Sequence, residues 1–256
     1  MKGDFGMSET NVLPGAEPFY AENGKIGVLI SHGYTGSPQS IRYLAEGLAK
    51  AGFTVALPRL KGHGTTPVDM ATSTASDWIR DLEQAMAWLQ ERCDSLFMTG
   101  LSMGGTLTLF MAGQYPDVFK GIVPINALIS SDNPDLASLV YMANGPAEVQ
   151  GIGSDIKDPH TKELAYPVVP VPTLKELFAL TKVTDDLLPR ITCPMLIMVS
   201  REDHVVPPAN AEYILQKVPS QDKHLVWLEN SYHVATLDND KDLIVQKSIE
   251  FIKAHL

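Results

Sequence analysis

The sequence predicts an α/β fold in which a mostly parallel central sheet is flanked by helices and carries a small inserted cap. Three observations support this prediction. Short apolar runs alternate with segments of helical periodicity, as in a chain built from β-α-β units. A glycine-rich turn at residues 100–105 joins one apolar run directly to a helix-like segment. A long stretch, residues 127–190, interrupts the alternation.

The expected strands are the apolar runs, taken in chain order. Phe19 and Tyr20 form an expected edge strand before Gly24. Because parallel neighbours cannot be joined by a hairpin, the segments between the later runs are expected to cross over as helices. The parallel strands are expected at residues 26–31, 53–57, 95–100, 121–126, 195–200 and 225–229.

Two of the expected helices have a clear buried face. Between the second and third parallel strands, apolar residues recur at steps of three and four, which is typical of an amphipathic helix packed on a sheet. These residues are Trp78, Leu82, Ala85, Met86 and Leu89. The last helix is expected from about residue 241 to the end, with Leu243, Ile244, Ile249, Phe251 and Ile252 as its buried candidates.

Residues 127–190 are expected to form the cap, inserted between two core segments, 1–126 and 191–256. This stretch is rich in Pro and Gly and contains no strand-like run. Thr173 with Glu176 three residues later has the form of a capping box, which predicts a helix over 174–182. A structureless loop of this length is uncommon inside a compact domain, so a small lid is the better interpretation.

Composition limits the class of protein. Of the 256 residues 45% are hydrophobic, and the formal net charge is −10, so the chain is globular and its field repels nucleic acid and anionic membranes. Neutral or cationic small molecules are the favoured ligands. No run approaches the roughly 18 apolar residues of a membrane span, and the start lacks the apolar core of a secretory signal. These features predict a cytoplasmic protein without stable membrane insertion, with Cys93 and Cys193 as core thiols.

The expected nucleophile is Ser102, in the G-x-S-x-G pattern of residues 100–104. Glycine is needed on both sides because the serine occupies a strained strand-to-helix turn where side chains would clash. The pattern alone is weak, and its alternative is a serine that only turns the chain or caps the helix. Here an apolar run precedes the motif and a helix-like segment follows it, which favours the nucleophile.

A serine nucleophile needs a general base, and seven histidines compete for this role. His233 follows the last expected strand, whereas His224 lies at the start of that strand. Catalytic groups of an open α/β sheet lie at the carboxyl ends of its strands, which favours His233. The acid is expected after the strand at 195–200, where Asp203 is preferred to Glu202. The alternatives are a surface histidine and an aspartate that only caps the next helix.

Backbone donors are expected to bind the oxyanion of an acyl-transfer reaction. The N–H groups of Tyr34, after the first parallel strand, and of Met103, after the nucleophile, are the candidates. His32 and His63 are expected to be structural histidines that tie down their loops. The sequence lacks metal-ligand spacings, a P-loop and G-x-G-x-x-G, so neither a metal nor a cofactor is expected.

Together these motifs resemble the α/β-hydrolase superfamily over essentially the whole chain. Residues 15–20, 57–64, 100–107 and 231–238 look like the bacterial monoacylglycerol lipases and small thermophilic carboxylesterases. The resemblance implies an α/β-hydrolase fold, a catalytic triad of Ser102, Asp203 and His233, oxyanion donors at Tyr34 and Met103, and a small cap over an acyl pocket.

The resemblance also implies substrate contacts in the cap. In such lipases a cap glutamate contacts the glycerol hydroxyls, and the string at 152–166 places this residue at Glu163 and adds Ile152 as a second contact. The alternative is a solvated surface carboxylate at Glu163. The sequence departs from the group's pattern at residues 167–170 and around 129–149, which leaves the acyl-chain and alcohol preference open.

The resemblance therefore implies a serine carboxylester hydrolase that acts through an acyl-enzyme, with a monoacylglycerol as the expected substrate. A second hypothesis keeps the triad for a thioesterase, a peptidase or a short-chain acyl esterase. A third is a small-molecule receptor on the same fold, which fold alone does not exclude. The expected partner is a small acyl ester, with transient contact between the cap and lipid surfaces.

Overall fold

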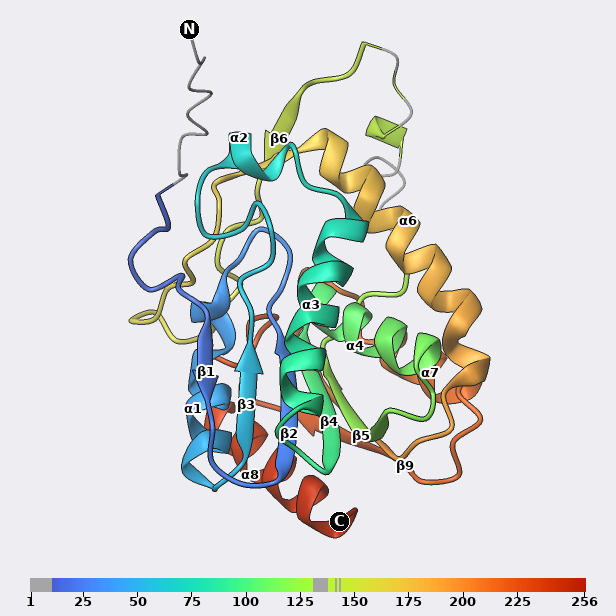
Figure 1. Cartoon of the computed structure of the whole chain (residues 1–256). Helices are drawn as coiled ribbons and strands as arrows, with labels where there is room; N and C mark the ends of the chain where they lie inside the picture. The colour runs from blue at the N-terminus through green and yellow to red at the C-terminus, as the bar shows by residue number, and fades with distance from the viewer. Residues whose placement is uncertain (1–10, 131–137, 141, 143) are drawn as a thin grey trace, which may run out of the picture.

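The computed structural model describes residues 11–130, 138–140, 142 and 144–256. Within these residues, seven strands form the central sheet in the order β1-β3-β2-β4-β5-β8-β9 (Figure 1). β1 pairs antiparallel with β3, and every other pair in this sheet is parallel. The strands are β1 (Phe19–Ala21), β2 (Ile26–Ser31), β3 (Thr54–Leu57), β4 (Ser95–Leu101), β5 (Phe119–Ile125), β8 (Met195–Ser200) and β9 (Lys223–Leu228).

This sheet confirms the predicted strands, with small shifts at their ends. The largest shifts are at the starts of β5 and β9, which begin at Phe119 and Lys223 rather than at residues 121 and 225. Lys223 pairs with Met195 of β8, and His224 pairs with Leu196. β9 is the last strand of the sheet, where polar side chains can reach water, so two polar residues belong to the strand although the apolar pattern omits them.

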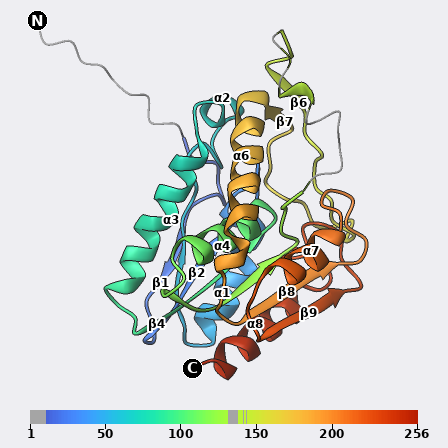
Figure 2. The same ribbon diagram turned by 90° about the vertical axis from the view of Figure 1, so that its right-hand side faces the viewer.

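Helices cover both faces of the sheet, as Figures 1 and 2 show. α1 and α8 pack in one apolar cluster with Val28 and Ile30 of β2. α3, α4 and α7 pack in a second cluster with Leu29, because neighbouring residues of a strand point to opposite faces. The helices are α1 (Arg42–Lys50), α2 (Pro67–Met70), α3 (Ala75–Gln90), α4 (Met103–Gln114), α6 (Val171–Leu187), α7 (Ala209–Lys217) and α8 (Lys241–Ala254), with single 3₁₀ turns at η1 (Pro38–Ile41) and η2 (Leu188–Arg190).

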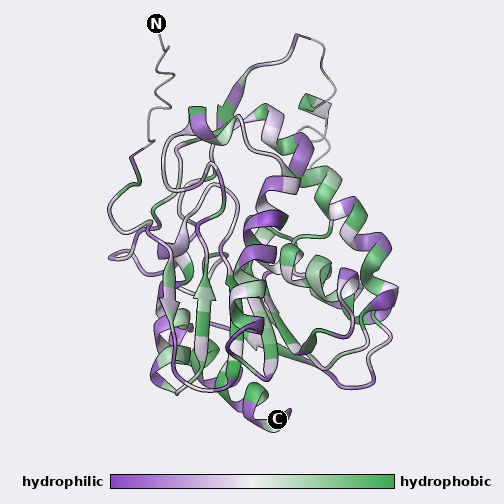
Figure 3. Ribbon diagram, viewed as in Figure 1, coloured by the Kyte–Doolittle hydropathy of each residue, from purple (hydrophilic) through white to green (hydrophobic). Residues whose placement is uncertain are grey.

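The two helices predicted from periodicity are confirmed. All five predicted apolar residues of α3 are buried, and a capping box between Thr74 and Asp77 fixes its start. In α8, Ile244, Phe251 and Ile252 are buried, whereas Leu243 and Ile249 are only partly buried. Figure 3 shows the sheet as mainly hydrophobic, with mixed polar and apolar residues along the helices.

The stretch expected to lack strands contains two of them. β6 (Glu148–Gln150) and β7 (Val168–Pro170) form a short antiparallel pair, so the expectation of no strand over 127–190 was wrong. Strands of only three residues, the second of which ends in Pro170, leave no alternating pattern for sequence analysis to detect. Part of the stretch, residues 131–137, 141 and 143, lies outside the described residues.

α6 begins at Val171, so the predicted capping box at Thr173 was wrong. Pro172 is well tolerated in the first turn of α6, because backbone N–H groups there have no acceptor within the helix and proline lacks this group. The Thr173 hydroxyl donates to the Pro170 carbonyl at 2.8 Å, and the Glu176 carboxylate instead accepts the Ala75 N–H at 2.9 Å.

α6 packs on the core rather than standing apart from it (Figure 2). Leu177 and Leu180 belong to the same apolar cluster as Leu107 of α4. Gly113 of α4 lies so close to α6 that an added Cβ would sit 2.9 Å from the Leu187 Cβ. The limits of the cap at residues 127 and 190 stay a prediction, and this packing favours a cap that ends before α6.

Three further expectations concern single residues and composition. Cys93 and Cys193 are free and partly exposed at the margin of the core, rather than fully buried. Across the described part of the chain, no helix is both long enough and apolar enough to cross a membrane. The same residues hold no group of three His, Cys, Asp or Glu side chains that could bind a metal ion.

Candidate active site

Ser102 stands in a strained turn between β4 and α4. Its φ of 58° and ψ of −120° lie outside the ordinary regions for a residue with a side chain. Neighbouring glycines make the turn possible: a Cβ on Gly100 would lie 2.2 Å from the Gly104 carbonyl oxygen, and a Cβ on Gly104 would lie 2.2 Å from that of Ser31. The Ser102 N–H donates to the Ile125 carbonyl at 2.9 Å, which ties the turn to β5. This is the strand-turn-helix context expected of a nucleophile elbow.

The structure joins His233 to Asp203. His233 Nδ1 lies 2.7 Å from Asp203 Oδ2, with the Asp203 side chain fully buried and 8% of the His233 side chain exposed. The other carboxylate oxygen of Asp203 accepts the N–H groups of Val205 and Val206 at 2.9 and 2.8 Å. One carboxylate oxygen of Asp203 therefore stabilises its own loop, and the other binds the imidazole of His233.

The competing residues lie elsewhere. The Glu202 side chain is 55% exposed and pairs with Lys157 at 3.1 Å. The His224 side chain is 67% exposed and pairs with Asp222 at 2.9 Å. Neither residue lines the cavity that contains Ser102 and His233.

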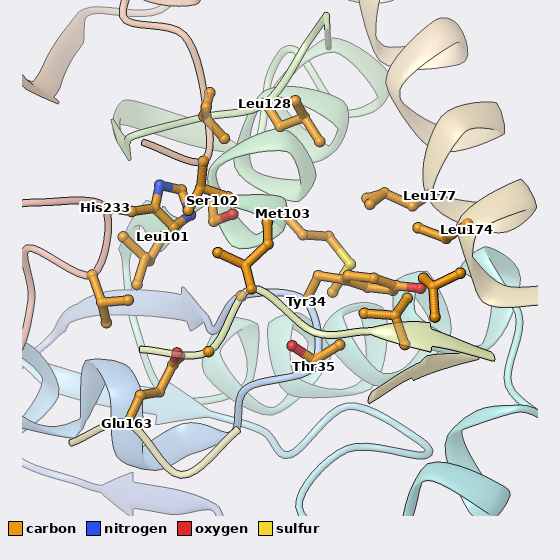
Figure 4. Close-up of a pocket in the computed structure, with 18 of the residues that line it drawn as sticks. Tyr34, Thr35, Leu101, Ser102, Met103, Leu128, Glu163, Leu174, Leu177 and His233 are labelled. Carbon is orange, nitrogen blue, oxygen red and sulfur yellow. The ribbon is translucent and has the colours of Figure 1, made fainter. Parts of the chain in front are cut away.

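Ser102 and His233 line a cavity of about 300 Å³. Figure 4 shows both side chains at one end of this cavity, with Leu174 and Leu177 of α6 at the other. The wall is mainly apolar, so the cavity suits an acyl chain whose carbonyl carbon reaches the serine. Its apolar residues include Leu101, Leu128, Val149, Leu174, Leu177 and Phe178.

The two expected oxyanion donors also line the cavity. Met103 is the first residue of α4, where backbone N–H groups have no acceptor within the helix. Tyr34 follows β2, and its hydroxyl lies 2.5 Å from Thr173 Oγ1 on α6. Burial raises the pKa of the Tyr34 phenol above its usual range. The Tyr166 N–H donates to the Thr35 carbonyl at 3.1 Å, so residues 34 and 35 are held by Thr173 of α6 and by Tyr166 from the chain between β6 and β7.

His32 and His63 are buried within the loops after β2 and β3. His32 Nε2 accepts the Leu60 N–H at 3.1 Å while Nδ1 lies 2.9 Å from the Gly33 carbonyl, so both ring nitrogens are used within the loops. Burial lowers the pKa of His32 well below its usual value and that of His63 to about 4, which keeps both rings neutral at pH 7. His63 Nδ1 lies 3.1 Å from the Lys61 carbonyl oxygen, so each ring contacts its own loop, as expected for structural histidines.

Glu163 reaches the same cavity from residues 151–167, which lie between β6 and β7 and form the cap segment (Figure 4). Its Oε1 is so close to Gly36 that an added Cβ there would lie 2.7 Å away. Burial raises the pKa of the Glu163 carboxyl to about 7, although the nearby His233 and the Ser40 hydroxyl favour ionisation. Ile152 lines the cavity as well, with 68% of the residue exposed at its rim.

Two carboxylates that sequence analysis did not single out bind the loop that carries His233. Asp155 accepts the His233 N–H at 3.0 Å, although the two residues are 78 positions apart. Asp238 is fully buried and accepts the N–H groups of Lys157, Asp158 and Tyr232. The only signal in the sequence was the position of Asp155 and Asp238 inside strings already typical of the resemblance.

Residues 23–149 and 154–240 match the profile of the Hydrolase_4 family, described as serine aminopeptidase, S33. The chain belongs to this family. The Hydrolase_4 family lies within the α/β-hydrolase superfamily, as the motifs predicted. The family is described by one activity, and the residues that line the cavity decide which substrate this member takes.

Curated relatives of this family member are similar along nearly their whole length. The chain is 54% identical to the thermostable monoacylglycerol lipase of Bacillus sp. (strain H-257), over 95% of this chain and 97% of the relative. It is 30% identical to the carboxylesterase of Bacillus subtilis (strain 168), over 93% and 96%.

Solved structures of two lipolytic proteins share the fold. A chain from the work on LipS and LipT, described as metagenome-derived lipolytic enzymes, superposes with a TM-score of 0.94 at 62% identity, covering 96% of this chain and all of that one. The monoacylglycerol lipase of Paleococcus ferrophilus superposes with a TM-score of 0.77 at 17% identity, over 94% of this chain and all of that one. The second likeness concerns the fold alone.

Proposed function

We propose that this member of the Hydrolase_4 family is a serine carboxylester hydrolase that acts on neutral single-chain esters, with monoacylglycerols as the preferred class. The observation that carries the proposal is the cavity in which Ser102 and His233 share one end of an apolar channel. The bond between His233 and the buried Asp203 supports it. The relatives named monoacylglycerol lipase and carboxylesterase support the same reaction class.

The reaction follows from the roles of these groups. Ser102 Oγ attacks the ester carbonyl carbon while His233 Nε2 takes the hydroxyl proton, and Asp203 keeps the imidazole oriented through Nδ1. The N–H groups of Tyr34 and Met103 bind the oxyanion of the tetrahedral intermediate. His233 then gives the proton to the departing alcohol, and a water molecule, activated by the same imidazole, releases the acid from the acyl-enzyme. Neither step requires a cofactor.

The substrate preference rests on the two ends of the cavity. The apolar end accepts one acyl chain and offers little room for a second. At the polar end, Glu163 is positioned to bind a glycerol hydroxyl, because a desolvated hydroxyl without a partner costs about 1–3 kcal/mol. Ile152 at the rim contacts the substrate on entry, and the exposed Met142 and Ile152 bring the cap into transient contact with lipid surfaces. A cytoplasmic location and the absence of nucleic-acid binding stay predictions from composition.

A substrate panel tests the proposal. Monoacylglycerols, diacylglycerols, triacylglycerols and p-nitrophenyl esters of matched chain length are compared by kcat/KM. We expect multiple turnover with monoacylglycerols ahead of the bulkier glycerides. Efficient triacylglycerol hydrolysis would contradict the cavity argument, and a single slow burst without turnover would favour a receptor.

Variants at two residues sharpen this test. Glu163→Gln should lower kcat/KM for a monoacylglycerol about tenfold and leave the matched p-nitrophenyl ester nearly unchanged, because only the first substrate carries glycerol hydroxyls. Equal losses on both substrates would contradict the glycerol contact. Asp203→Ala should abolish turnover, whereas Glu202→Ala should leave it largely intact. The reverse result would identify Glu202 as the acidic residue of the triad.

A further inference from the structure

Asp155, in the cap segment between β6 and β7, binds two of the three loops that carry the proposed catalytic side chains, those of His233 and Asp203. Its side chain is 13% exposed. Oδ2 accepts the N–H of His233 at 3.0 Å and the N–H of His204 at 3.2 Å. Oδ1 lies 2.9 Å from His204 Nδ1, and the Asp155 carbonyl accepts the Val234 N–H at 3.0 Å. One residue therefore connects the loop of the base with the residue that follows the acid.

These bonds complete the fixation of the His233 backbone. Its carbonyl accepts from Asn126 Nδ2 at 2.7 Å, and Asn126 is itself 2% exposed at the end of β5. Asn126 therefore fixes one side of the His233 peptide from the core, and Asp155 fixes the other from the cap segment. The hydrogen bond between the His233 and Asp203 side chains then fixes the orientation of the imidazole ring.

Small displacements of such a residue matter for rate. A base must lie within hydrogen-bond reach of the nucleophile, and a misplacement of about 1 Å can cost on the order of a hundredfold. Bonds to an ionised carboxylate are the stronger kind of hydrogen bond, which suits a residue that has to hold a loop in one place.

Resting on the proposed function, we propose that Asp155 is a positioning residue: its carboxylate aligns His233 with Ser102 and ties this alignment to the docking of the cap segment. The residue does not touch the substrate, since it is absent from the cavity wall. It acts through the backbone of His233 and through His204. The cap segment and the proposed triad are therefore assembled together.

The carboxylate of Asp155 also leaves a signature in His204. The hydrogen bond to Asp155 raises the pKa of His204, and the nearby charges of Asp203 and Glu202 act in the same direction. The rings of Tyr232 and His204 pack edge to face, with 4.6 Å between their centres. Lys157 Nζ lies 5.3 Å from the centre of the Tyr232 ring. A substitution at residue 155 should therefore change the titration of His204, whose side chain is 59% exposed.

The first test is Asp155→Ala, with kcat and KM measured on a p-nitrophenyl ester per active site titrated with a fluorophosphonate. We expect kcat to fall roughly 10- to 100-fold with KM changed less than twofold, since the substrate cavity is intact. The matched control is Asp158→Ala, three residues further on, because in the described part of the chain its carboxylate accepts hydrogen bonds only from His160 and Thr161 of its own turn. An unchanged kcat in Asp155→Ala, or an equal loss in Asp158→Ala, would overturn the proposal.

Asp155→Asn provides a readout that general destabilisation would not move. The amide oxygen can accept the His233 N–H, and the amide nitrogen can donate to His204 when that ring is neutral. We therefore expect kcat of Asp155→Asn to approach the wild-type value at pH 8.5 and to fall severalfold below it at pH 6, where a protonated His204 and the amide would both be donors. A ratio to wild type that is equal at both pH values would overturn the proposal. If the wild type neither turns over esters nor reacts with the fluorophosphonate, the proposed function fails instead.

Discussion

Replacing Glu163 by glutamine is expected to stabilise the protein above neutral pH and to change its stability little at pH 5. Burial raises the pKa of this carboxyl from its ordinary value of 4.5 to about 7. Below pH 4.5 the carboxyl is protonated in both the folded and the unfolded chain. Between pH 4.5 and 7 the unfolded chain releases the proton while the folded chain keeps it, so the free energy of unfolding falls as pH rises.

The size of the effect follows from the pKa. Each pKa unit corresponds to about 1.4 kcal/mol, so a rise from 4.5 to about 7 removes about 3 kcal/mol of stability once the pH exceeds 7. At pH 5 the same reasoning gives less than about 1 kcal/mol. Glutamine keeps the shape of the side chain without the charge, so Glu163→Gln should gain about 3 kcal/mol over wild type at pH 8 and little at pH 5.

Urea unfolding at pH 5 and pH 8 measures this difference. The free energy of unfolding is compared between wild type and Glu163→Gln at each pH, after checking that the slope with urea is unchanged. Glu202→Gln is the matched control, because its exposed ion pair with Lys157 should change the free energy of unfolding little at either pH. A gain for Glu163→Gln that is equal at pH 5 and pH 8 would refute the raised pKa of this carboxyl.

The remaining predictions concern the site and its supports. Ser102→Ala and His233→Ala should each reduce ester turnover by on the order of 10⁶, and the double variant should lose little more, because the two side chains act as a unit; additive losses in steady-state assays would show a wrong assignment. Thr173→Val leaves the Tyr34 hydroxyl unpaired and should cost about 1–3 kcal/mol in urea unfolding, whereas Tyr34→Phe, which spares the bond from Thr173 to Pro170, should cost about 1 kcal/mol; equal costs would contradict this reasoning. Turnover should survive EDTA, because backbone N–H groups are expected to bind the oxyanion; a loss that zinc or calcium restores would overturn it.

The sequence predicts the sheet and the place of the nucleophile because both leave local patterns. Apolar runs identify parallel strands that are buried on both faces, and the spacing of Gly100 and Gly104 around Ser102 reflects a turn with no room for side chains. The positions of Asp203 and His233 follow from the rule that the carboxyl ends of parallel strands meet at one edge. The family resemblance adds the cap residues Glu163 and Ile152.

Contacts between distant segments leave no such pattern. Asp155 and His233 are 78 positions apart, and a carboxylate that binds backbone N–H groups imposes no residue type on its partner. The start of α6 was misplaced for a related reason: Thr173 and Glu176 have the spacing of a capping box, but both side chains bond to other parts of the fold. Tertiary contacts here override a local signal.

The packing of α6 on α4 limits how this protein can be redesigned by exchange of segments. A graft that replaced residues 127–190 as one block would discard Leu177 and Leu180 and leave an apolar face of α4 open to water. It would also separate Gly113 from the Leu187 side chain for which it makes room. A chimera that keeps α6 with its host and takes residues 144–170 from a donor preserves this contact. The crossover point for recombination therefore lies at the start of α6, where Pro170 and Pro172 have no backbone N–H to donate.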